Sequence, residues 1–263
     1  MQPSQHARSR PMRWWAMATD SVDAHRQREL ARAVNYPLAR WYLRPAAGWL
    51  AGWLAPSELN PCWLTGAGLL CALIATGLLW LAPGWTAAAA LLVLLAWFFD
   101  RADGQLARRR GAASARGAWF DANVDEATDL LLHLGVAAAA AARLDADWPW
   151  ALLLAFFGGK YLLMYGLHSA EGLATENASE SSPRHRRVID TEAASSPTSG
   201  AAALVRWLYH LPGNADVRIH LLAAALLLAL WHPIWLAVEL SAVAAYYNVR
   251  WLVRYPLMLQ RLR

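Results

Sequence analysis

Apolar residues in this chain gather in long blocks rather than in amphipathic stripes or alternating strand patterns. An α-helix rises about 1.5 Å per residue, so about 20 apolar residues cross the hydrocarbon core of a bilayer. Six blocks predict transmembrane helices, at residues 62–82, 85–99, 118–142, 148–169, 217–231 and 233–253. The second helix is expected to continue past Asp100 into water, and the fifth is short for a span. The pattern predicts an all-α integral membrane protein.

The segments around these blocks have other patterns. Residues 1–33 are polar and basic and predict a disordered tail without a secretory signal. Residues 34–60 mix Trp and Leu with arginines, which predicts an interfacial amphipathic helix; an ordinary connecting helix packed on the bundle fits the pattern equally well. Residues 61–263 are expected to form one six-helix transmembrane domain. Within it, residues 171–200 are rich in Ser, Glu, Ala and Pro and predict a mobile cytoplasmic loop.

Composition and charge agree with a multi-span protein. The chain is 57% hydrophobic and only 16% charged, and it carries 16 Trp. Its basic residues gather on alternate sides of the apolar blocks: Arg8 through Arg44, Arg101, Arg108 to Arg110, Arg184, Arg186, Arg187, and Arg250 to Arg263. The opposite turns hold only Arg143. The positive-inside rule then predicts a multi-pass protein of the cell inner (plasma) membrane with both termini in the cytoplasm. It also explains the net charge of +5 without nucleic-acid binding.

Four aspartates stand at the ends of two neighbouring blocks. Asp100 and Asp103 close the second block, and Asp121 and Asp125 open the third. A charged side chain at membrane depth costs at least about 2.5–3.5 kcal/mol, so such residues are usually functional. Residues three and four apart share a helix face, so the four carboxylates converge if the two helices lie side by side. Hard oxygen ligands in this number predict a Mg²⁺ or Mn²⁺ site.

Small and basic residues lie among these carboxylates. Gly104 and Gly117 leave space in which a phosphate or a flat group could approach the backbone. Arg108 offers a planar guanidinium for phosphate oxygens. Metal, phosphate and a spare carboxylate together indicate phosphoryl-group transfer.

The spacing matches a known signature. Asp100, two residues, Asp103-Gly104, two residues, Ala107-Arg108, eight residues, Gly117, three residues, Asp121, three residues and Asp125 resemble the signature of the CDP-alcohol phosphotransferase (CDP-alcohol phosphatidyltransferase) family at every signature position. The resemblance implies six spans, often a homodimer, and a site that faces the cytoplasm. It also implies transfer of a phosphatidyl group from a CDP-linked lipid, commonly CDP-diacylglycerol, to an alcohol with release of CMP.

The resemblance further implies residue roles. Asp100, Asp103, Asp121 and Asp125 would hold one or two Mg²⁺ or Mn²⁺ ions, and Asp125 would also be the catalytic base. The nucleotide and phosphate site would be shaped by Gly104, Ala107, Arg108, Gly117 and Thr65. Thr65 belongs to a stretch from Pro61 to Gly68 that is similar to the family's Pro-Asn-x-x-Thr-x-x-Gly, with Cys62 in place of Asn.

Other positions depart from the family pattern. Glu126 replaces the usual basic residue after the last aspartate. Leu167 and Ser169 stand where members that use sugar or polyol phosphate acceptors carry two basic residues. An acceptor with its own phosphate would therefore lose two partners. Serine, glycerol phosphate, inositol phosphate, a polar-lipid hydroxyl and an amino alcohol all stay open as acceptors.

Three further polar residues lie inside predicted spans. Asp129 and His133 continue the face of Asp121 and Asp125 at four-residue steps, and packing or hydrogen bonding is the simpler role for both. Lys160, the only lysine, either contacts an anionic acceptor or donor phosphate, or pairs with Asp129.

Two rival functions belong to other classes. A transporter of protons or divalent cations would also need intramembrane carboxylates, but it would not need two glycines and an arginine at fixed offsets, and no second copy of the pattern indicates a repeat. An inactive lipid-binding relative would be expected to have a broken signature. Metal-dependent release of CMP separates an enzyme from both rivals.

Overall fold

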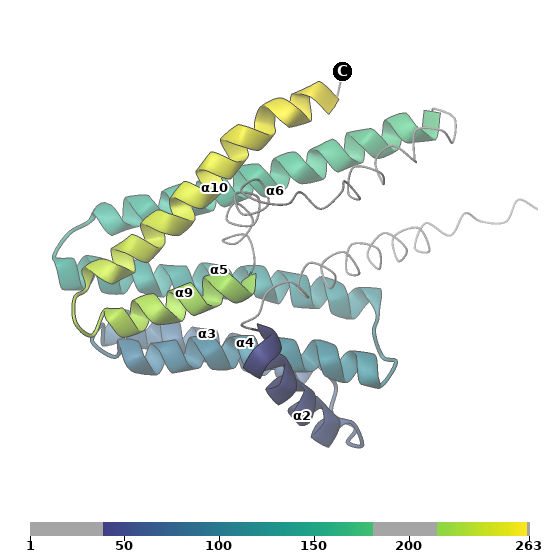
Figure 1. The fold of residues 1–263 in the computed structure, drawn as a ribbon, viewed down its shortest axis with the longest axis horizontal. Coiled ribbons are helices and arrows are strands. Elements are labelled where there is room, and N and C mark those ends of the chain that lie inside the picture. The colour runs from purple at the N-terminus through teal and green to yellow at the C-terminus, as the bar shows by residue number, and fades with distance from the viewer. Residues whose placement is uncertain (1–38, 181–214, 262–263) are drawn as a thin grey trace, which may run out of the picture.

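The computed structural model describes residues 39–180 and 215–261, which fold entirely as helices in these ranges (Figure 1). The elements are a π-helical turn η1 (Ala39–Leu43), α2 (Arg44–Leu54), α3 (Cys62–Leu81), α4 (Thr86–Arg109), α5 (Ala115–Leu144), α6 (Trp148–Glu180), α9 (Ala215–Leu228) and α10 (Ile234–Arg261). The predicted basic tail at residues 1–33 and the cluster Arg184, Arg186 and Arg187 lie outside the described residues.

Three described helices are long and apolar enough to cross a membrane. They are α3, α5 and the part of α6 over Trp148–Ser169. The other three predicted spans form helices that do not reach this standard, each for a visible reason. The apolar part of α4 stops at Asp100, α9 has 14 residues, and the second half of α10 carries Arg250 and Arg254. The all-helical class is confirmed, and six spans stay a prediction.

The helix bounds correct one sequence expectation. The helix α6 continues to Glu180, so residues 171–180 are helical rather than part of a loop, and residues 181–200 lie outside the described residues. By contrast, α4 runs without a break past Asp100 to Arg109, as its sequence predicts. A helix that continues through the acidic positions holds their side chains at fixed angles around one axis.

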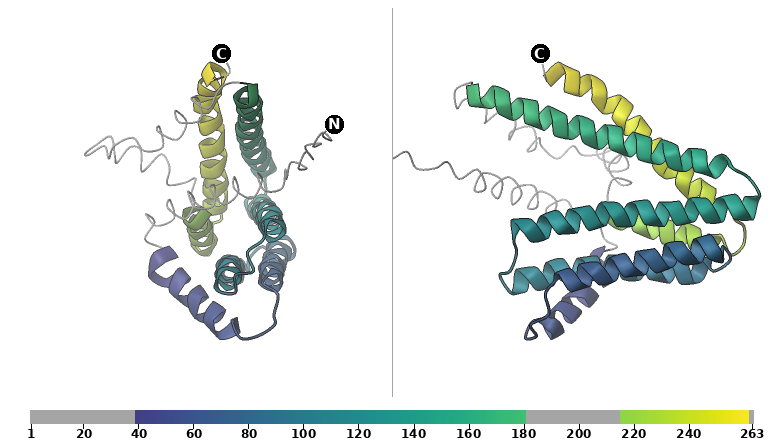
Figure 2. Two further views of the ribbon diagram at one scale, coloured as in Figure 1. Left: turned by 90° about the vertical axis from the view of Figure 1, so that its right-hand side faces the viewer. Right: turned by 180° about the vertical axis from the view of Figure 1, so that it is seen from behind.

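Helices α3, α4 and α5 form the packed centre of the fold. The helix α3 contacts both α4 and α5, while α9 packs on α4 and α10 packs on α6 (Figures 1 and 2). Glycines allow the close approaches, because a Cβ added at Gly68 or Gly135 would lie 3.0 Å from backbone atoms of Ala96 or Thr76. Small residues at helix contacts are how membrane helices pack without a large hydrophobic driving force.

The helix α2 crosses α4 on the outside of this centre (Figure 1). Its small residues Ala47 and Ala51 are fully buried and pack with Ala102 and Leu106 of α4. The helix α2 therefore packs on the bundle, as expected if it is a connecting helix. Trp49 nevertheless points outward on the opposite side, so the interfacial interpretation stays a prediction.

The turn after α2 is held by one arginine at the end of α4. The Arg110 guanidinium donates hydrogen bonds to the backbone carbonyls of Leu54, Ala55, Ser57 and Leu59. Since α4 ends beside this turn, the first long helix begins at a defined place relative to the acidic end of α4.

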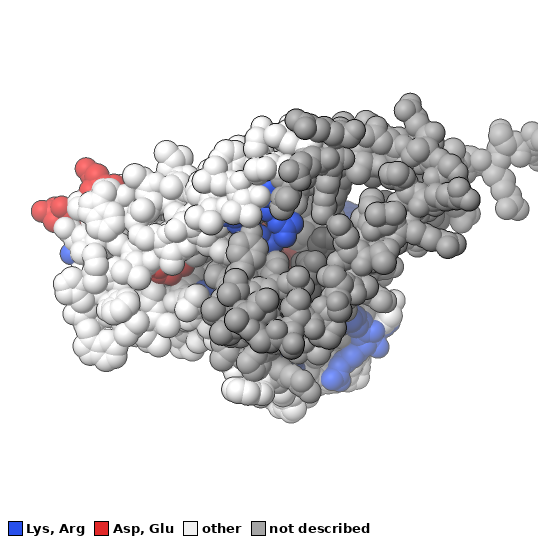
Figure 3. Space-filling view, turned by 45° about the horizontal axis from the view of Figure 1, so that its top comes forward, with Lys and Arg blue, Asp and Glu red and all other residues white. Residues whose placement is uncertain are grey.

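The outer surface of the described helices is largely uncharged. In the space-filling view, acidic and basic side chains cover only small parts of the described atoms (Figure 3). Leu70, Ile74 and Leu81 of α3 and Leu154 of α6 are among the exposed large apolar residues. Exposed apolar surface of this extent is typical of helices that face lipid.

Candidate active site between α4 and α5

The acidic ends of α4 and α5 come together as their spacing predicts. Carboxylate oxygens of Asp100, Asp103 and Asp121 all lie within 4.8 Å of one another. The side chain of Asp125 is within hydrogen-bonding reach of Asp100. The structure thus brings all four predicted aspartates into one cluster, with Asp103 buried and Asp125 on the exposed side.

The donor set of this cluster fits a hard divalent cation. Each of the three closest side chains offers a carboxylate oxygen, which is the ligand type that Mg²⁺ and Mn²⁺ prefer. Like charges at this separation repel, and the repulsion grows as water is removed. A bound divalent cation would offset that repulsion, so Asp100, Asp103 and Asp121 are the residues that would hold it.

A threonine from α3 completes the buried side of the cluster. Thr65 is buried and donates a hydrogen bond to Oδ2 of Asp103. The resemblance assigns Thr65 to the nucleotide, whereas its hydroxyl here contacts a carboxylate of the cluster. A hydrogen bond of this kind fixes the orientation of a metal-ligating carboxylate. The role in nucleotide binding stays a prediction.

The predicted phosphate-binding residues line the same end of the two helices. A Cβ added at Gly104 would lie 3.2 Å from Nη1 of Arg108, so this guanidinium lies directly over the glycine. At the start of α5, Ser114 caps the helix by accepting a hydrogen bond from the Gly117 amide at 3.1 Å. Ala107 is half-buried one turn beyond Asp103. Substrate contacts of these residues stay predictions.

A second polar cluster lies one helical turn further along α5. Lys160 of α6 is buried and forms ion pairs with Asp129 and, at 2.7 Å, with Glu126. Arg218 of α9 also faces Asp129, with 3.6 Å between Nη2 and Oδ2. Arg218 donates a hydrogen bond to the Tyr247 hydroxyl of α10. Lys160 therefore has the Asp129 partner that the structural interpretation expected, while its substrate role stays untested.

This cluster continues inward through a histidine. The Nδ1 atom of His133 lies 2.7 Å from the Asp129 backbone carbonyl oxygen, and its Nε2 lies 3.3 Å from Oε1 of Glu239. Both side chains are buried. His133 thus links α5 to α10, which is the packing role that its position in the polar stripe predicts.

One buried contact beside the acidic cluster was not expected from the sequence. Asp216 of α9 accepts a hydrogen bond from Nε1 of Trp97 at 2.8 Å and lies 3.3 Å from Nη2 of Arg101. The Arg101 guanidinium also lies 4.1 Å from the Trp97 ring centroid and 3.7 Å from Oδ2 of Asp100. Arg101 therefore connects the acidic cluster to α9. In the sequence, Asp216 stands directly before the predicted span at residues 217–231, and nothing there indicates its partner.

Comparison with known proteins identifies the family of this chain. No curated protein matches the chain. The model of the CDP-alcohol phosphatidyltransferase family matches residues 58–243, which include both acidic helix ends and the second polar cluster. That match covers more than half of the 263 residues. On this match, the chain belongs to the CDP-alcohol phosphatidyltransferase family.

Proposed function

We propose that this protein transfers a phosphatidyl group from a CDP-linked lipid, CDP-diacylglycerol being the expected donor, to an alcohol acceptor and releases CMP in phospholipid synthesis. The observation that carries the proposal is the convergence of the Asp100, Asp103 and Asp121 carboxylates from two helices. An intact signature in a chain of this family supports catalysis rather than lipid binding alone.

The proposed mechanism assigns separate tasks to the residues of the site. Asp100, Asp103 and Asp121, with Asp125, would hold one or two Mg²⁺ or Mn²⁺ ions. When bound, these ions would neutralise charge on the diphosphate and on the CMP leaving group. The Arg108 guanidinium, held over Gly104, would contact phosphate oxygens.

Asp125 is the proposed catalytic base. It lies on the exposed side of the cluster, where an incoming hydroxyl can reach it. Its carboxylate would accept the hydroxyl proton as the oxygen bonds to phosphorus, while the bond from phosphorus to the CMP oxygen breaks. A weak base is sufficient if proton transfer accompanies bond formation.

The membrane arrangement belongs to the same proposal. Six spans with an interfacial α2 would place the acidic ends of α4 and α5 at the cytoplasmic face of the inner membrane, because the arginines Arg101 and Arg108 to Arg110 lie at that end. A homodimer is proposed from the family alone. A cation transporter stays the alternative function, and it predicts flux without any requirement for a cytidine nucleotide.

One assay tests the reaction. Purified protein in detergent with CDP-diacylglycerol and Mg²⁺ or Mn²⁺ is expected to release CMP and form a new lipid when the acceptor is supplied. Removal of the metal with EDTA should abolish release, and re-addition should restore it. Cation flux into protein-containing vesicles, with no CMP release from the donor whichever acceptor is supplied, would contradict the proposal and favour transport.

Charges next to Asp125 also support an acceptor class. The acceptor hydroxyl must lie at Asp125, and Asp129 lies four residues away, about 6 Å along the helix. The two cations there, Lys160 and Arg218, face the carboxylates of Asp129 and Glu126. Because these four charges cancel, we propose a neutral or zwitterionic alcohol, such as serine or another amino alcohol, over an acceptor that carries a phosphate.

Changing Glu126 to Gln should shift this preference. Loss of one carboxylate leaves Lys160 with less compensation, so a phosphate-bearing acceptor gains a partner. Because Glu126 is exposed, we expect the kcat/KM ratio of glycerol phosphate to serine to rise only about two- to fivefold. CMP release with each acceptor measures the ratio. Glu58→Gln, on the exposed turn before α3, is the matched control, and an unchanged ratio in Glu126→Gln would contradict the assignment.

A further inference from the structure

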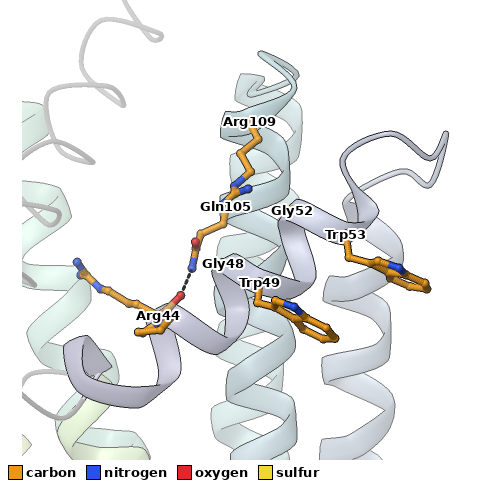
Figure 4. Close-up of a pocket in the computed structure, with 8 residues that line it drawn as sticks. Arg44, Gly48, Trp49, Gly52, Trp53, Gln105 and Arg109 are labelled. Atoms are coloured by element: carbon orange, nitrogen blue, oxygen red, sulfur yellow. Dashed lines mark hydrogen bonds between the residues drawn. The ribbon is translucent and has the colours of Figure 1, made fainter.

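A groove of about 690 Å³ lies between α2 and α4, away from both polar clusters (Figure 4). Six of its lining residues come from α2 and two from α4. They are Arg44, Pro45, Gly48, Trp49, Gly52, Trp53, Gln105 and Arg109. None of these lining residues is acidic, so the groove has a positive charge from its two arginines.

Glycines on α2 create the groove. A Cβ added at Gly48 would lie 2.9 Å from Oε1 of Gln105, and one added at Gly52 would lie 2.8 Å from Nη1 of Arg109. The two long side chains of α4 therefore lie directly over the α2 backbone, as Figure 4 shows. Gln105 also donates a hydrogen bond of 3.2 Å to the carbonyl of Arg44. Arg109 thus lies against the α2 backbone where a glycine leaves room for its guanidinium.

The two arginines of the groove differ from their neighbours in their partners. Arg110, the next residue along α4, donates to several carbonyls, and Arg101 pairs with Asp216. Within the described part of the chain, no carboxylate forms an ion pair with the side chain of Arg44 or Arg109. A groove with Arg109 over one part of it and Arg44 at its other end, and with no carboxylate among its described lining residues, is suited to an anion with several oxygens, such as a phosphate.

Two tryptophans identify the surroundings of that anion. The side chains of Trp49 and Trp53 are 74% and 70% exposed, and both rings point to the same side of α2 (Figure 4). Tryptophan rings gather at the headgroup level of a bilayer, where the ring contacts lipid and the N–H meets polar groups. Arginine and tryptophan together on one short helix therefore complement a lipid headgroup better than a soluble anion.

The groove is separate from the acidic cluster. At 3.6 residues per turn, Arg109 lies about half a turn around α4 from Asp100, and Gln105 lies about half a turn from Asp103. The carboxylates face α5, whereas Gln105 and Arg109 face α2. A lipid in the groove would therefore not occupy the position proposed for the reacting donor.

We propose that this groove binds the headgroup phosphate of an anionic phospholipid. Arg109 contacts the phosphate oxygens, Arg44 adds positive charge at the other end of the groove, and Trp49 and Trp53 lie in the headgroup layer beside it. The bound lipid anchors α2 to the bilayer and to α4. This site needs no turnover, so it rests on the proposed interfacial position of α2 but not on the proposed reaction.

Native mass spectrometry of the full-length protein in detergent tests the site. Phosphatidylglycerol and phosphatidylcholine are the two probes, titrated separately. We expect tighter binding of phosphatidylglycerol, and the double variant Arg44→Gln/Arg109→Gln should lose about tenfold or more of that affinity, as expected for two arginines near a lipid phosphate. Its affinity for phosphatidylcholine should fall much less, because the choline group offsets the charge of the phosphate in that lipid. The double variant Arg116→Gln/Arg254→Gln removes two arginines elsewhere and should bind like the original protein.

A second variant fills the groove without changing charge. Gly52→Leu must displace the Arg109 guanidinium and should lower phosphatidylglycerol affinity to a similar degree. Gly77→Leu is its control, because a Cβ there meets no atom within 4 Å. Unchanged affinity in both groove variants would overturn the proposal. Equal binding of the two lipids, or displacement of phosphatidylglycerol by millimolar inorganic phosphate alone, would also overturn a site for a lipid headgroup.

Discussion

Replacing Asp103 with Asn is expected to lower metal-dependent CMP release by about 10²–10³-fold, the range for loss of one group that stabilises transition-state charge. Asp103 is the buried member of the three-carboxylate cluster, and Thr65 fixes its orientation. An amide has the same shape and still offers one oxygen, but it lacks the negative charge that holds a divalent cation. Release of CMP from CDP-diacylglycerol, measured across a series of Mg²⁺ and Mn²⁺ concentrations, gives the effect.

The same variant should change stability in a direction that depends on metal. Without metal, Asp103→Asn removes one of several repelling charges, so the metal-free protein should melt at a higher temperature than the original. Added Mn²⁺ should raise the melting temperature of the original protein and have less effect on the variant, since binding stabilises only the form that binds.

The control for this prediction is Asp145→Asn at the far end of α5. Asp145 is exposed and adopts a left-handed backbone conformation that Asn accepts readily. It should leave both activity and the metal-induced shift unchanged. If Asp103→Asn retains the shift in full, the cluster is not the cation site.

Replacing Asp129 with Asn should lower the free energy of unfolding by about 3 kcal/mol, the cost of breaking a buried ion pair by removing one partner. Asp129 faces Lys160 of α6, Arg218 of α9 and, one turn further along its own helix, His133. An amide leaves the lysine and arginine buried with less compensation. Unfolding by SDS in mixed micelles, followed by tryptophan fluorescence, measures the loss.

A second substitution separates charge from shape at this position. Lys160→Met in the Asp129→Asn background removes the cation that lost its partner, so the double variant should recover part of the stability. If the double variant loses the sum of what Asp129→Asn and Lys160→Met lose singly, the two side chains do not interact. Glu126 complicates the cycle only slightly, because its side chain is 60% exposed.

The sequence was sufficient to predict the features that depend on one helix at a time. Apolar blocks predicted the helices of the bundle, and spacing of three and four residues predicted that Asp100 and Asp103 share a face, as do Asp121 and Asp125. Convergence of the two pairs needed only a short turn between adjacent helices. That part of the site is present in the structure.

Contacts between distant segments could not be predicted in this way. Thr65 and Asp103 are 38 residues apart, and Trp97 and Asp216 are 119 apart. Their pairing depends on how α3 and α9 rotate about their own axes, which periodicity in a uniformly apolar helix does not determine. The helical extension of α6 to Glu180 was missed for a different reason, because a polar, Ser-rich and Ala-rich composition is compatible with either helix or loop.

The hydrogen bonds of Arg110 to the turn after α2 limit which positions can vary among related chains. The Arg110 side chain recognises main-chain oxygens of the turn that follows α2, including those of Ala55 and Leu59. Every amino acid has a main-chain oxygen, so the residues at positions 55 and 59 can be replaced without loss of these hydrogen bonds. Position 110 has no such freedom, since a lysine there could not reach several carbonyls with one planar fork.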